Sequence, residues 1–392
     1  MKLASRLEHI EPFYVMECAK AAAELARSEA CKHSPMIFLN IGEPDFTAPP
    51  QVLRSAEQAL QAGRTQYTDA TGLPELRAAL SRWYAQRFRL DIAPGRIVIT
   101  AGASAALQLA CLALVDTGDE VLMPDPSYPC NRHFVAAAQG TAVLIPTSAQ
   151  GRFQPTCAGI ESAWGSHTQG VLLASPSNPT GTSIEPAEMR RIVEFVRTRG
   201  GFTIVDEIYL GLSYDEHFAT SALTHGGDVI SINSFSKYFS MTGWRLGWMV
   251  VPESLVPPIE RLAQNLYICA STLAQRAALA CFEPEALAEY ERRRTEFRAR
   301  RDYLVPALQQ IGLAVPVMPD GAFYAWADCS AHAKSSWDFT FEMMRSAHVA
   351  MTPGRDFGPH AADRFVRLSF ASSMGQLQEA VARLARALHA TA

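Results

Sequence analysis

The sequence lacks the signatures of several protein classes. No apolar run approaches the ~20 residues that a membrane span needs, and the N-terminus has no apolar segment typical of a secretory signal. CxxC pairs and HExxH-type histidine spacings are absent, so a metal site has little support. GxGxxG and GxxxxGK[ST] are absent too, which argues against the usual dinucleotide and P-loop sites. A net charge of −4 offers no basic surface for nucleic acid.

The composition that remains is that of a globular protein. The chain has 392 residues, of which 48% are hydrophobic and 19% charged. This length suggests two or three domains, or one large α/β domain with an appendage. Eight scattered cysteines in so long a chain are typical of reduced thiols, so we expect a cytoplasmic protein.

Short apolar strands alternate with helices through the middle of the chain. The expected strands are 96–100, 120–124, 142–146, 170–174, 201–206 and 229–233, and the expected helices are 105–115, 132–139 and 186–199. Continuous apolar strands joined by helices predict a mostly parallel sheet covered on both faces. After about residue 280, a long helix at 286–310, strand-like stretches at 321–328 and 364–370, and an amphipathic helix from about 376 predict a smaller α+β domain.

Polar residues follow the expected strands, where ligands of such sheets collect. They are a small-residue turn at 101–104, Asn178, Asp206, Lys237 and Arg245. Taken singly, each has a plain alternative: a tight turn, a rigid loop, a helix cap or solvated carboxylate, or a surface charge. Together they suit a cofactor with a phosphate, a protonatable ring nitrogen and an aldehyde that condenses with an amine.

Four motifs carry a family resemblance. SNPTG (177–181), DEIY (206–209), SFSKYFSMTGWRLGW (234–248) and RLSF (367–370) stand in the order of the fold-type I pyridoxal 5′-phosphate aminotransferases of class I/II, the aspartate aminotransferase superfamily. The chain resembles this family from NIGEPDF (40–46) onward. The resemblance implies a large domain with a mostly parallel seven-stranded sheet flanked by helices, and a smaller α+β domain from both termini. The expected ranges are 1–43 (an N-terminal arm and part of the small domain), 44–280 (the cofactor-binding domain) and 281–392 (the small domain).

The resemblance also implies roles around the cofactor ring. Lys237 is similar to the Schiff-base lysine, which also moves a proton from the substrate. Asp206 would pair with the pyridine nitrogen and keep it protonated. Asn178 and Tyr209 would bond the phenolic oxygen, and Tyr128 would stack on the ring.

Further roles concern the phosphate, the substrate and a second subunit. The phosphate cradle implied by the resemblance consists of the Ala103 and Ser104 backbone, Ser234, Ser236 and Arg245. Arg367 would bind the substrate carboxylate, with Asn178 and Gly42 beside it. Without the resemblance, the period-two strand would place Arg367 on an exposed face. Tyr67 is similar to a tyrosine that reaches the phosphate of the neighbouring subunit, which implies a homodimer with shared sites.

Two segments depart from the family's pattern. The phosphate turn at 102–104 reads GAS, without the second glycine or the threonine of many relatives. Arg355 and Asp356 stand where relatives often have small residues. Arg355 lines the substrate entrance or forms a salt bridge with Asp356, and we favour the salt bridge. Arg132 is a candidate cation for a distal substrate carboxylate, but a solvated helix face is the favoured interpretation.

The resemblance implies an amino-acid aminotransferase with a ping-pong mechanism. Its expected partners are amino acids and 2-oxo acids, and neither nucleic acid nor a membrane is expected among them. The alternative is a carbon–sulfur β-lyase or another α/β-eliminating enzyme. Ser177 stands where the family's lyases usually have histidine, which favours transamination. A regulatory protein of this fold usually carries a DNA-binding domain, for which the ~40 residues before NIGEPDF leave little room.

The substrate is expected from a group of aromatic residues. Phe13, Tyr14, Phe323 and Tyr324 are interpreted as an apolar side-chain pocket. This pocket predicts a neutral or hydrophobic amino acid as one substrate, with glutamate and 2-oxoglutarate as the second pair.

Overall fold

A seven-stranded sheet forms the centre of the molecule. The computed structural model describes residues 2–4, 7–8, 10 and 14–390. In spatial order the strands are β2 (Ile97–Thr100), β8 (Gly247–Val250), β7 (Ile230–Ser234), β6 (Phe202–Asp206), β5 (Thr168–Ala174), β3 (Glu120–Asp125) and β4 (Thr141–Pro146). Every neighbouring pair is parallel except those of β8, which runs antiparallel to both β2 and β7. The expected mostly parallel sheet is confirmed.

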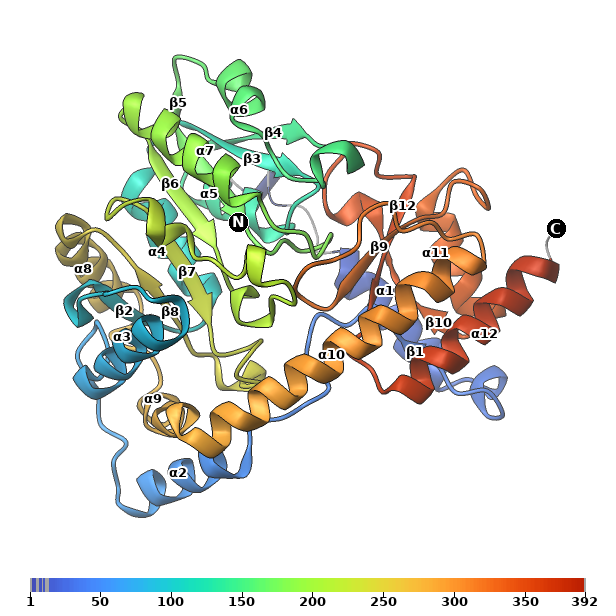
Figure 1. The fold of residues 1–392 in the computed structure, drawn as a ribbon, viewed down its shortest axis with the longest axis horizontal. Helices are drawn as coiled ribbons and strands as arrows, with labels where there is room; N and C mark the ends of the chain where they lie inside the picture. The colour runs from blue at the N-terminus through green and yellow to red at the C-terminus, as the bar shows by residue number, and fades with distance from the viewer. Residues whose placement is uncertain (1, 5–6, 9, 11–13, 391–392) are drawn as a thin grey trace.

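Helices cover both faces of this sheet because its strands are apolar on both sides (Figure 1). In β5, Leu172 faces one layer, whereas Val171 and Leu173 face the other. The Leu172 side packs on α4 (Ala103–Leu114), α5 (Cys130–Ala137) and α8 (Val256–Leu266), and the opposite side packs on α3 (Pro74–Phe88), α6 (Cys157–Ala163) and α7 (Pro186–Thr198).

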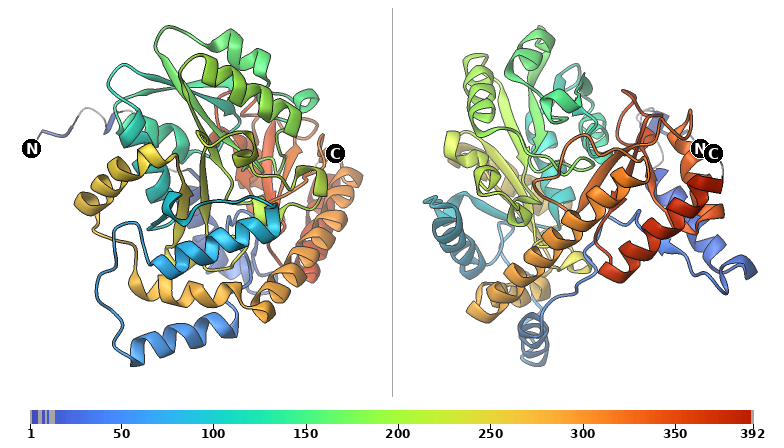
Figure 2. Two further views of the ribbon diagram at one scale, coloured as in Figure 1. Left: turned by 60° about the vertical axis from the view of Figure 1, so that its left-hand side comes forward. Right: turned by 45° about the vertical axis from the view of Figure 1, so that its right-hand side comes forward.

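A smaller part of the molecule is built from both ends of the chain. Its strands are β9 (Tyr324–Asp328), β11 (Thr352–Pro353) and β12 (Phe365–Ser369), with a separate parallel pair of β1 (Ile37–Phe38) and β10 (Val349–Ala350). Its helices are α1 (Tyr14–Ala26), α11 (Ser336–Ser346) and α12 (Met374–Ala390). The right-hand view of Figure 2 shows these orange, red and blue elements beside the green and yellow strands of the large sheet. The domain boundaries at 43/44 and 280/281 remain a prediction.

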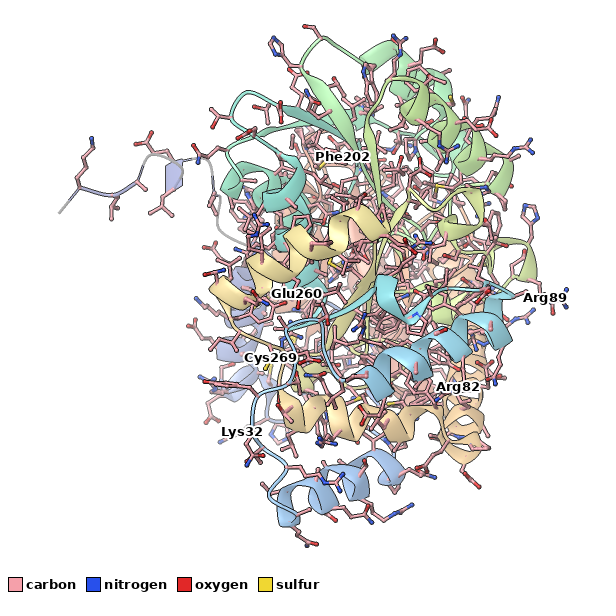
Figure 3. All side chains as sticks on the ribbon, turned by 90° about the vertical axis from the view of Figure 1, so that its left-hand side faces the viewer. Lys32, Arg82, Arg89, Phe202, Glu260 and Cys269 are labelled. Carbon is pink, nitrogen blue, oxygen red and sulfur yellow. The ribbon has the colours of Figure 1, made fainter. Side chains whose placement is uncertain are left out.

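Three further α-helices belong to the described part of the fold. α10 (Pro284–Gln310) is the 27-residue helix that runs in Figure 1 from the end of the molecule near α9 to the small sheet. α2 (Pro50–Gln61) packs on α9 (Thr272–Ala278). Figure 3 shows charged side chains such as those of Lys32, Arg82 and Arg89 on the outside of the molecule. No helix among the described residues is long and apolar enough to span a bilayer.

Most elements lie close to the expected ranges, but two differ from the prediction. The six strands expected in the middle of the chain lie within two residues of the observed ones, whereas β8 was not expected. The period-two pattern of residues 364–370 predicts that Arg367 is exposed. This prediction is wrong, because all five residues of β12 are buried. β12 is the middle strand of its sheet and is covered on both faces. None of the eight cysteines, all within the described part, forms a disulfide.

Candidate active site

A cavity of about 390 Å³ opens where the strands of the large sheet end. The parallel strands β2, β3, β5, β6 and β7 bring their carboxyl ends to this edge. β8 runs the other way, so the segment just before it reaches the same edge. Twelve of the thirteen predicted site residues line this one cavity: Gly42, Ala103, Ser104, Tyr128, Asn178, Asp206, Tyr209, Ser234, Ser236, Lys237, Arg245 and Arg367.

One end of the cavity is suited to an anion. α4 begins there at Ala103, and helix geometry leaves its first N–H groups, including those of Ala103 and Ser104, without intrahelical partners. Gly102 precedes them with φ +84°, and a Cβ at this position would come within 2.8 Å of Arg245 Nη2. A side chain at residue 102 would strain this turn and push the guanidinium away, so glycine allows the two to lie together. The GAS turn therefore forms a cradle without a second glycine.

Arg245 and two serines lie beside this helix start. Arg245 Nη1 donates to the Thr242 carbonyl at 3.1 Å, which fixes the guanidinium at the cavity wall. Ser234 Oγ donates to the Leu246 carbonyl at 3.3 Å and accepts from the Ser236 N–H at 3.0 Å, so it also holds the local turn. This group offers N–H, O–H and guanidinium donors of the kind that bind phosphate.

Lys237 lines the same cavity. Its Nζ donates to the Gly42 carbonyl at 2.6 Å, a contact between residues 195 positions apart. Burial lowers the pKa of Lys237 to about 8; Arg367 and Arg245 act in the same direction, while Glu43 and Asp206 oppose it. An amine with this pKa is neutral often enough near neutral pH to attack an aldehyde.

Asp206 is a buried carboxylate at the end of β6. It is only 4% exposed, and its Oδ1 accepts from the Ile208 N–H at 3.1 Å. Burial raises the pKa of Asp206 to about 7, although the Ile208 hydrogen bond and the Lys237 charge oppose this shift. The alternative of a solvated carboxylate is wrong. A buried carboxylate facing a cavity is stabilised when the cavity holds a protonated nitrogen.

Arg367 and Asn178 form a pair at the side of the cavity formed by the small sheet. Arg367 is 3% exposed, and its Nη1 donates to Asn178 Oδ1 at 2.8 Å. Its Nη2 donates to the Asn40 carbonyl at 2.8 Å and to Thr352 Oγ1 at 3.3 Å, whereas its buried Nε has no partner among the described residues. A buried guanidinium with a remaining donor is suited to a carboxylate.

Several lining residues were not expected from the sequence. Asn40 belongs to NIGEPDF, a motif quoted for the resemblance but given no role apart from Gly42. Val15, Met16 and Ala19 of α1, together with Ile41, line the cavity with apolar side chains. They come from the N-terminal segment, and no strand-end pattern could have indicated them, since only the tertiary fold brings α1 to the cavity.

The expected aromatic pocket is wrong in two of its four members. Tyr14 lies against Trp337 (6.1 Å between ring centroids) and Phe323 against Phe297 (5.6 Å), and neither lines the cavity. Tyr324 does line it, but its hydroxyl is paired with that of Tyr209 at 2.8 Å. Phe13 lies outside the described residues.

The arginine predictions are also corrected. Arg355 stacks over the rings of Tyr14 and Trp337, at 4.4 and 4.6 Å, and neither lines the cavity nor forms an ion pair with Asp356, both residues being in the described part. Asp356 instead accepts the N–H groups of Tyr14 and Val15. Arg132 is half-buried rather than on a solvated face, and it does not line the cavity either.

These observations fit pyridoxal 5′-phosphate. The cavity combines a glycine-dependent anion cradle, an amine with a lowered pKa, a buried carboxylate and an arginine with a remaining donor. Each property matches one part of the cofactor or of an amino acid substrate: phosphate, aldehyde, ring nitrogen and carboxylate. The fold and cavity define a pyridoxal-phosphate-dependent enzyme of fold type I.

Comparisons with known proteins agree with this class. The family model described as aminotransferase class I and II matches residues 34–384. The valine–pyruvate aminotransferase of Mycobacterium tuberculosis is 39% identical over 376 residues, which cover 96% of each chain. The crystal structure of an aminotransferase from Mycobacterium tuberculosis superposes with a TM-score of 0.95 at 38% identity over 100% of both chains. Aspartate aminotransferase of Thermus thermophilus with maleate gives a TM-score of 0.92 at 30% identity, covering 99% of this chain and 100% of that one.

This chain belongs to the class I and II aminotransferase family. It is an aminotransferase that uses pyridoxal phosphate. Members of the family are typically homodimers that act on amino acids and 2-oxo acids. The predicted family, fold, enzyme class and cofactor are therefore confirmed, whereas the roles of individual site residues remain proposals.

Proposed function

We propose that this enzyme transfers the α-amino group of an amino acid with a neutral, apolar side chain to a 2-oxo acid by a ping-pong mechanism. The observation that carries the proposal is the apolar lining contributed by Val15, Met16, Ala19 and Ile41. An apolar side chain gains free energy on leaving water for such a surface, at ~25 cal/mol per Å² buried. A distal carboxylate would lose its hydration there.

The charges of the cavity support the same substrate class. Among the described residues, the Lys and Arg side chains of the lining are Lys237, Arg245 and Arg367. We assign these to the amine chemistry, the phosphate and the α-carboxylate respectively. No further lysine or arginine of this chain's described lining is left for a second substrate carboxylate. The relative named valine–pyruvate aminotransferase acts, by its name, on an amino acid with a small apolar side chain.

The chemistry divides between the cofactor and this chain. When bound, pyridoxal 5′-phosphate supplies an aldehyde for the amino group and a ring that accepts the electron pair of the broken Cα–H bond. Arg367 orients the substrate carboxylate, and Lys237 Nζ removes the proton from the substrate Cα. Asp206 keeps a proton on the ring nitrogen through its negative charge. Asn178 and Tyr209 are the proposed hydrogen-bond partners of the ring oxygen, and Tyr128 packs against the ring.

Single-turnover reactions with a panel of amino acids test the donor. Holoenzyme is mixed with valine, leucine, alanine, glutamate and aspartate, and the loss of the cofactor's visible absorbance is followed. We expect the apolar amino acids to react with the larger kcat/KM. A preference for aspartate by more than about tenfold, ~1.4 kcal/mol in the transition state, would contradict the apolar-lining argument.

The acceptor is tested in the second half-reaction. 2-Oxoglutarate is the acceptor expected from the family resemblance, yet its distal carboxylate would meet the same apolar lining. We therefore propose that pyruvate or another short 2-oxo acid reacts at least as well. Adding each 2-oxo acid to the aminated enzyme and timing the return of absorbance compares them directly. Catalytic release of pyruvate and ammonia from sulfur amino acids would instead revive the lyase alternative.

A further inference from the structure

Tyr324 occupies a junction of the cavity. It is the first residue of β9 and is fully buried, yet it lines the cavity wall. Its hydroxyl lies 2.8 Å from that of Tyr209. A Cβ on Gly42 would come within 3.1 Å of the same oxygen, so the hydroxyl lies against the backbone whose carbonyl accepts from Lys237. Its ring also packs under the guanidinium of Arg367, 4.4 Å from the ring centroid.

Each hydroxyl carries one proton, and only one of these two protons forms the hydrogen bond between the hydroxyls. A tyrosine hydroxyl has one proton to donate and an oxygen that also accepts. If Tyr324 donates to Tyr209, the proton of Tyr209 stays available for an acceptor in the cavity. If Tyr209 donates, its proton is no longer available to such an acceptor. The direction of this hydrogen bond therefore decides whether Tyr209 can serve a ligand.

The surroundings favour Tyr324 as the donor. Burial raises the pKa of both hydroxyls, and that of Tyr209 is raised well above its usual value. Arg367 opposes this rise in both pKa values. For Tyr324 its effect follows directly after that of burial, because the guanidinium lies against the Tyr324 ring, whereas for Tyr209 the neighbouring Tyr324 raises the pKa further. The more acidic hydroxyl of a pair is the better donor. The hydrogen bond it gives also polarises the acceptor's own O–H group.

We propose that Tyr324 is a positioning residue that sets Tyr209 as a hydrogen-bond donor to the ring oxygen of the bound cofactor. This inference rests on the cofactor site proposed above. A donor to the ring oxygen stabilises the anionic form of the chromophore and thereby lowers the pKa at which its absorbance titrates. Tyr324 acts on that pKa only through Tyr209, while its ring supports Arg367.

A double-mutant cycle tests this chain of contacts. The absorbance of the bound cofactor is titrated with pH in the wild-type holoenzyme, Tyr324→Phe, Tyr209→Phe and the double variant. Tyr324→Phe keeps the ring beneath Arg367 and removes only the hydroxyl. We expect it to raise the titration midpoint by about half a pKa unit and Tyr209→Phe to raise it by about one unit. The double variant should match Tyr209→Phe alone.

Tyr290→Phe is the matched control. Its hydroxyl is buried and donates to Cys281 Sγ at 3.4 Å outside the cavity, so its loss should not move the midpoint. An unchanged or lowered midpoint in Tyr324→Phe would overturn the proposal. So would a shift that adds in full to that of Tyr209→Phe. Wild-type protein that gains no visible cofactor absorbance on incubation with pyridoxal 5′-phosphate would overturn the cofactor site itself, which the other outcomes leave intact.

Discussion

Burial changes the protonation of a single residue, Lys237. An exposed lysine would be almost fully protonated at neutral pH, whereas burial lowers the pKa of Lys237 to about 8. We therefore expect cofactor-free enzyme to react with pyridoxal 5′-phosphate at a rate that rises with pH and levels off above about 8. Stopped-flow absorbance from pH 6 to 10 measures this profile. A rate still rising steeply at pH 10 would mean that the amine has the pKa of an exposed lysine.

Burial raises the pKa of Asp206, and this makes the stability of the fold depend on pH. Its folded-state pKa of about 7 exceeds the reference value of 3.8, so the fold prefers the protonated acid. Its contribution to stability is present below about pH 4 and is lost as the pH rises through 7. We expect cofactor-free Asp206→Asn to melt at a higher temperature than wild type at pH 8, and the difference to shrink toward pH 4. Calorimetry across this range measures it, and a variant less stable at pH 8 would contradict the assigned burial cost.

Residue types were predicted better than residue environments. Lys237, Asp206 and Arg245 were found from the sequence because each follows or precedes an apolar strand at one edge of the sheet. The burial of Arg367 was not predictable from alternation, since β12 is covered on both faces. The aromatic ring of Tyr324 predicts an apolar pocket, but the sequence does not indicate the partner of its hydroxyl, because Tyr209 lies 115 positions away. Such pairings depend on the tertiary fold and leave no local pattern.

The start of α4 provides a prediction about an element. Gly102→Ala adds a Cβ that would meet Arg245 Nη2 at 2.8 Å, in a residue already at φ +84°. We expect the dissociation constant of pyridoxal 5′-phosphate to rise by about tenfold or more, ~1.4 kcal/mol, because the guanidinium must move away from the cradle. Gly118→Ala is the control, with φ +94° and no atom within 4 Å of the added Cβ. If both variants lost the same affinity for pyridoxal 5′-phosphate, backbone strain alone would explain the effect.

The position of α1 depends on a contact across the whole chain. The two carboxylate oxygens of Asp356 accept the N–H groups of Tyr14 at 3.1 Å and of Val15 at 2.7 Å, at the first turn of the helix. Asparagine has one acceptor oxygen, so Asp356→Asn removes one of these bonds. Because α1 supplies apolar lining, we expect KM for the amino acid to rise by roughly three- to tenfold while cofactor affinity stays constant.

Asp320→Asn controls for general destabilisation in this experiment. Asp320 is also buried and accepts the Ser183 N–H at 2.9 Å, but it does not line the cavity. Steady-state kinetics and cofactor titration of both variants make the comparison. Equal KM values in Asp356→Asn and wild type would show that α1 holds its place without this contact.

Elements were predictable where they were long and apolar. The helix expected at 286–310 and the strands of the parallel sheet were found because their patterns extend over enough residues. β8 was missed because it has four residues, begins with glycine and overlaps the end of the 234–248 motif that contains Arg245. Its antiparallel direction matters for the site, since it brings Arg245 to the edge at which the parallel strands end.

At the scale of the whole molecule, one predicted site residue stands apart. Tyr67 is 78% exposed and does not line the cavity of its own chain. Arg245 and Ser104 are exposed at the cavity edge as well. A tyrosine exposed in one protomer and cavity residues that remain uncovered are expected if a second copy of the chain completes the site. The family's typical homodimer supplies such a copy.

Mixing two impaired variants tests whether the site is shared. Lys237→Ala abolishes the amine, and Tyr67→Ala is expected to weaken phosphate binding. In a shared-site dimer, the Tyr67→Ala protomer of a mixed pair keeps its own Lys237 and receives Tyr67 from the other protomer, so one site is intact. Random pairing should then restore about a quarter of wild-type sites. If Tyr67 serves its own chain, no mixed dimer contains an intact site. Coexpression with two affinity tags isolates the mixed dimers. Their activity is divided by the number of intact Lys237 residues and compared with that of the Tyr67→Ala homodimer. A value no greater than that of the homodimer would exclude sharing through Tyr67.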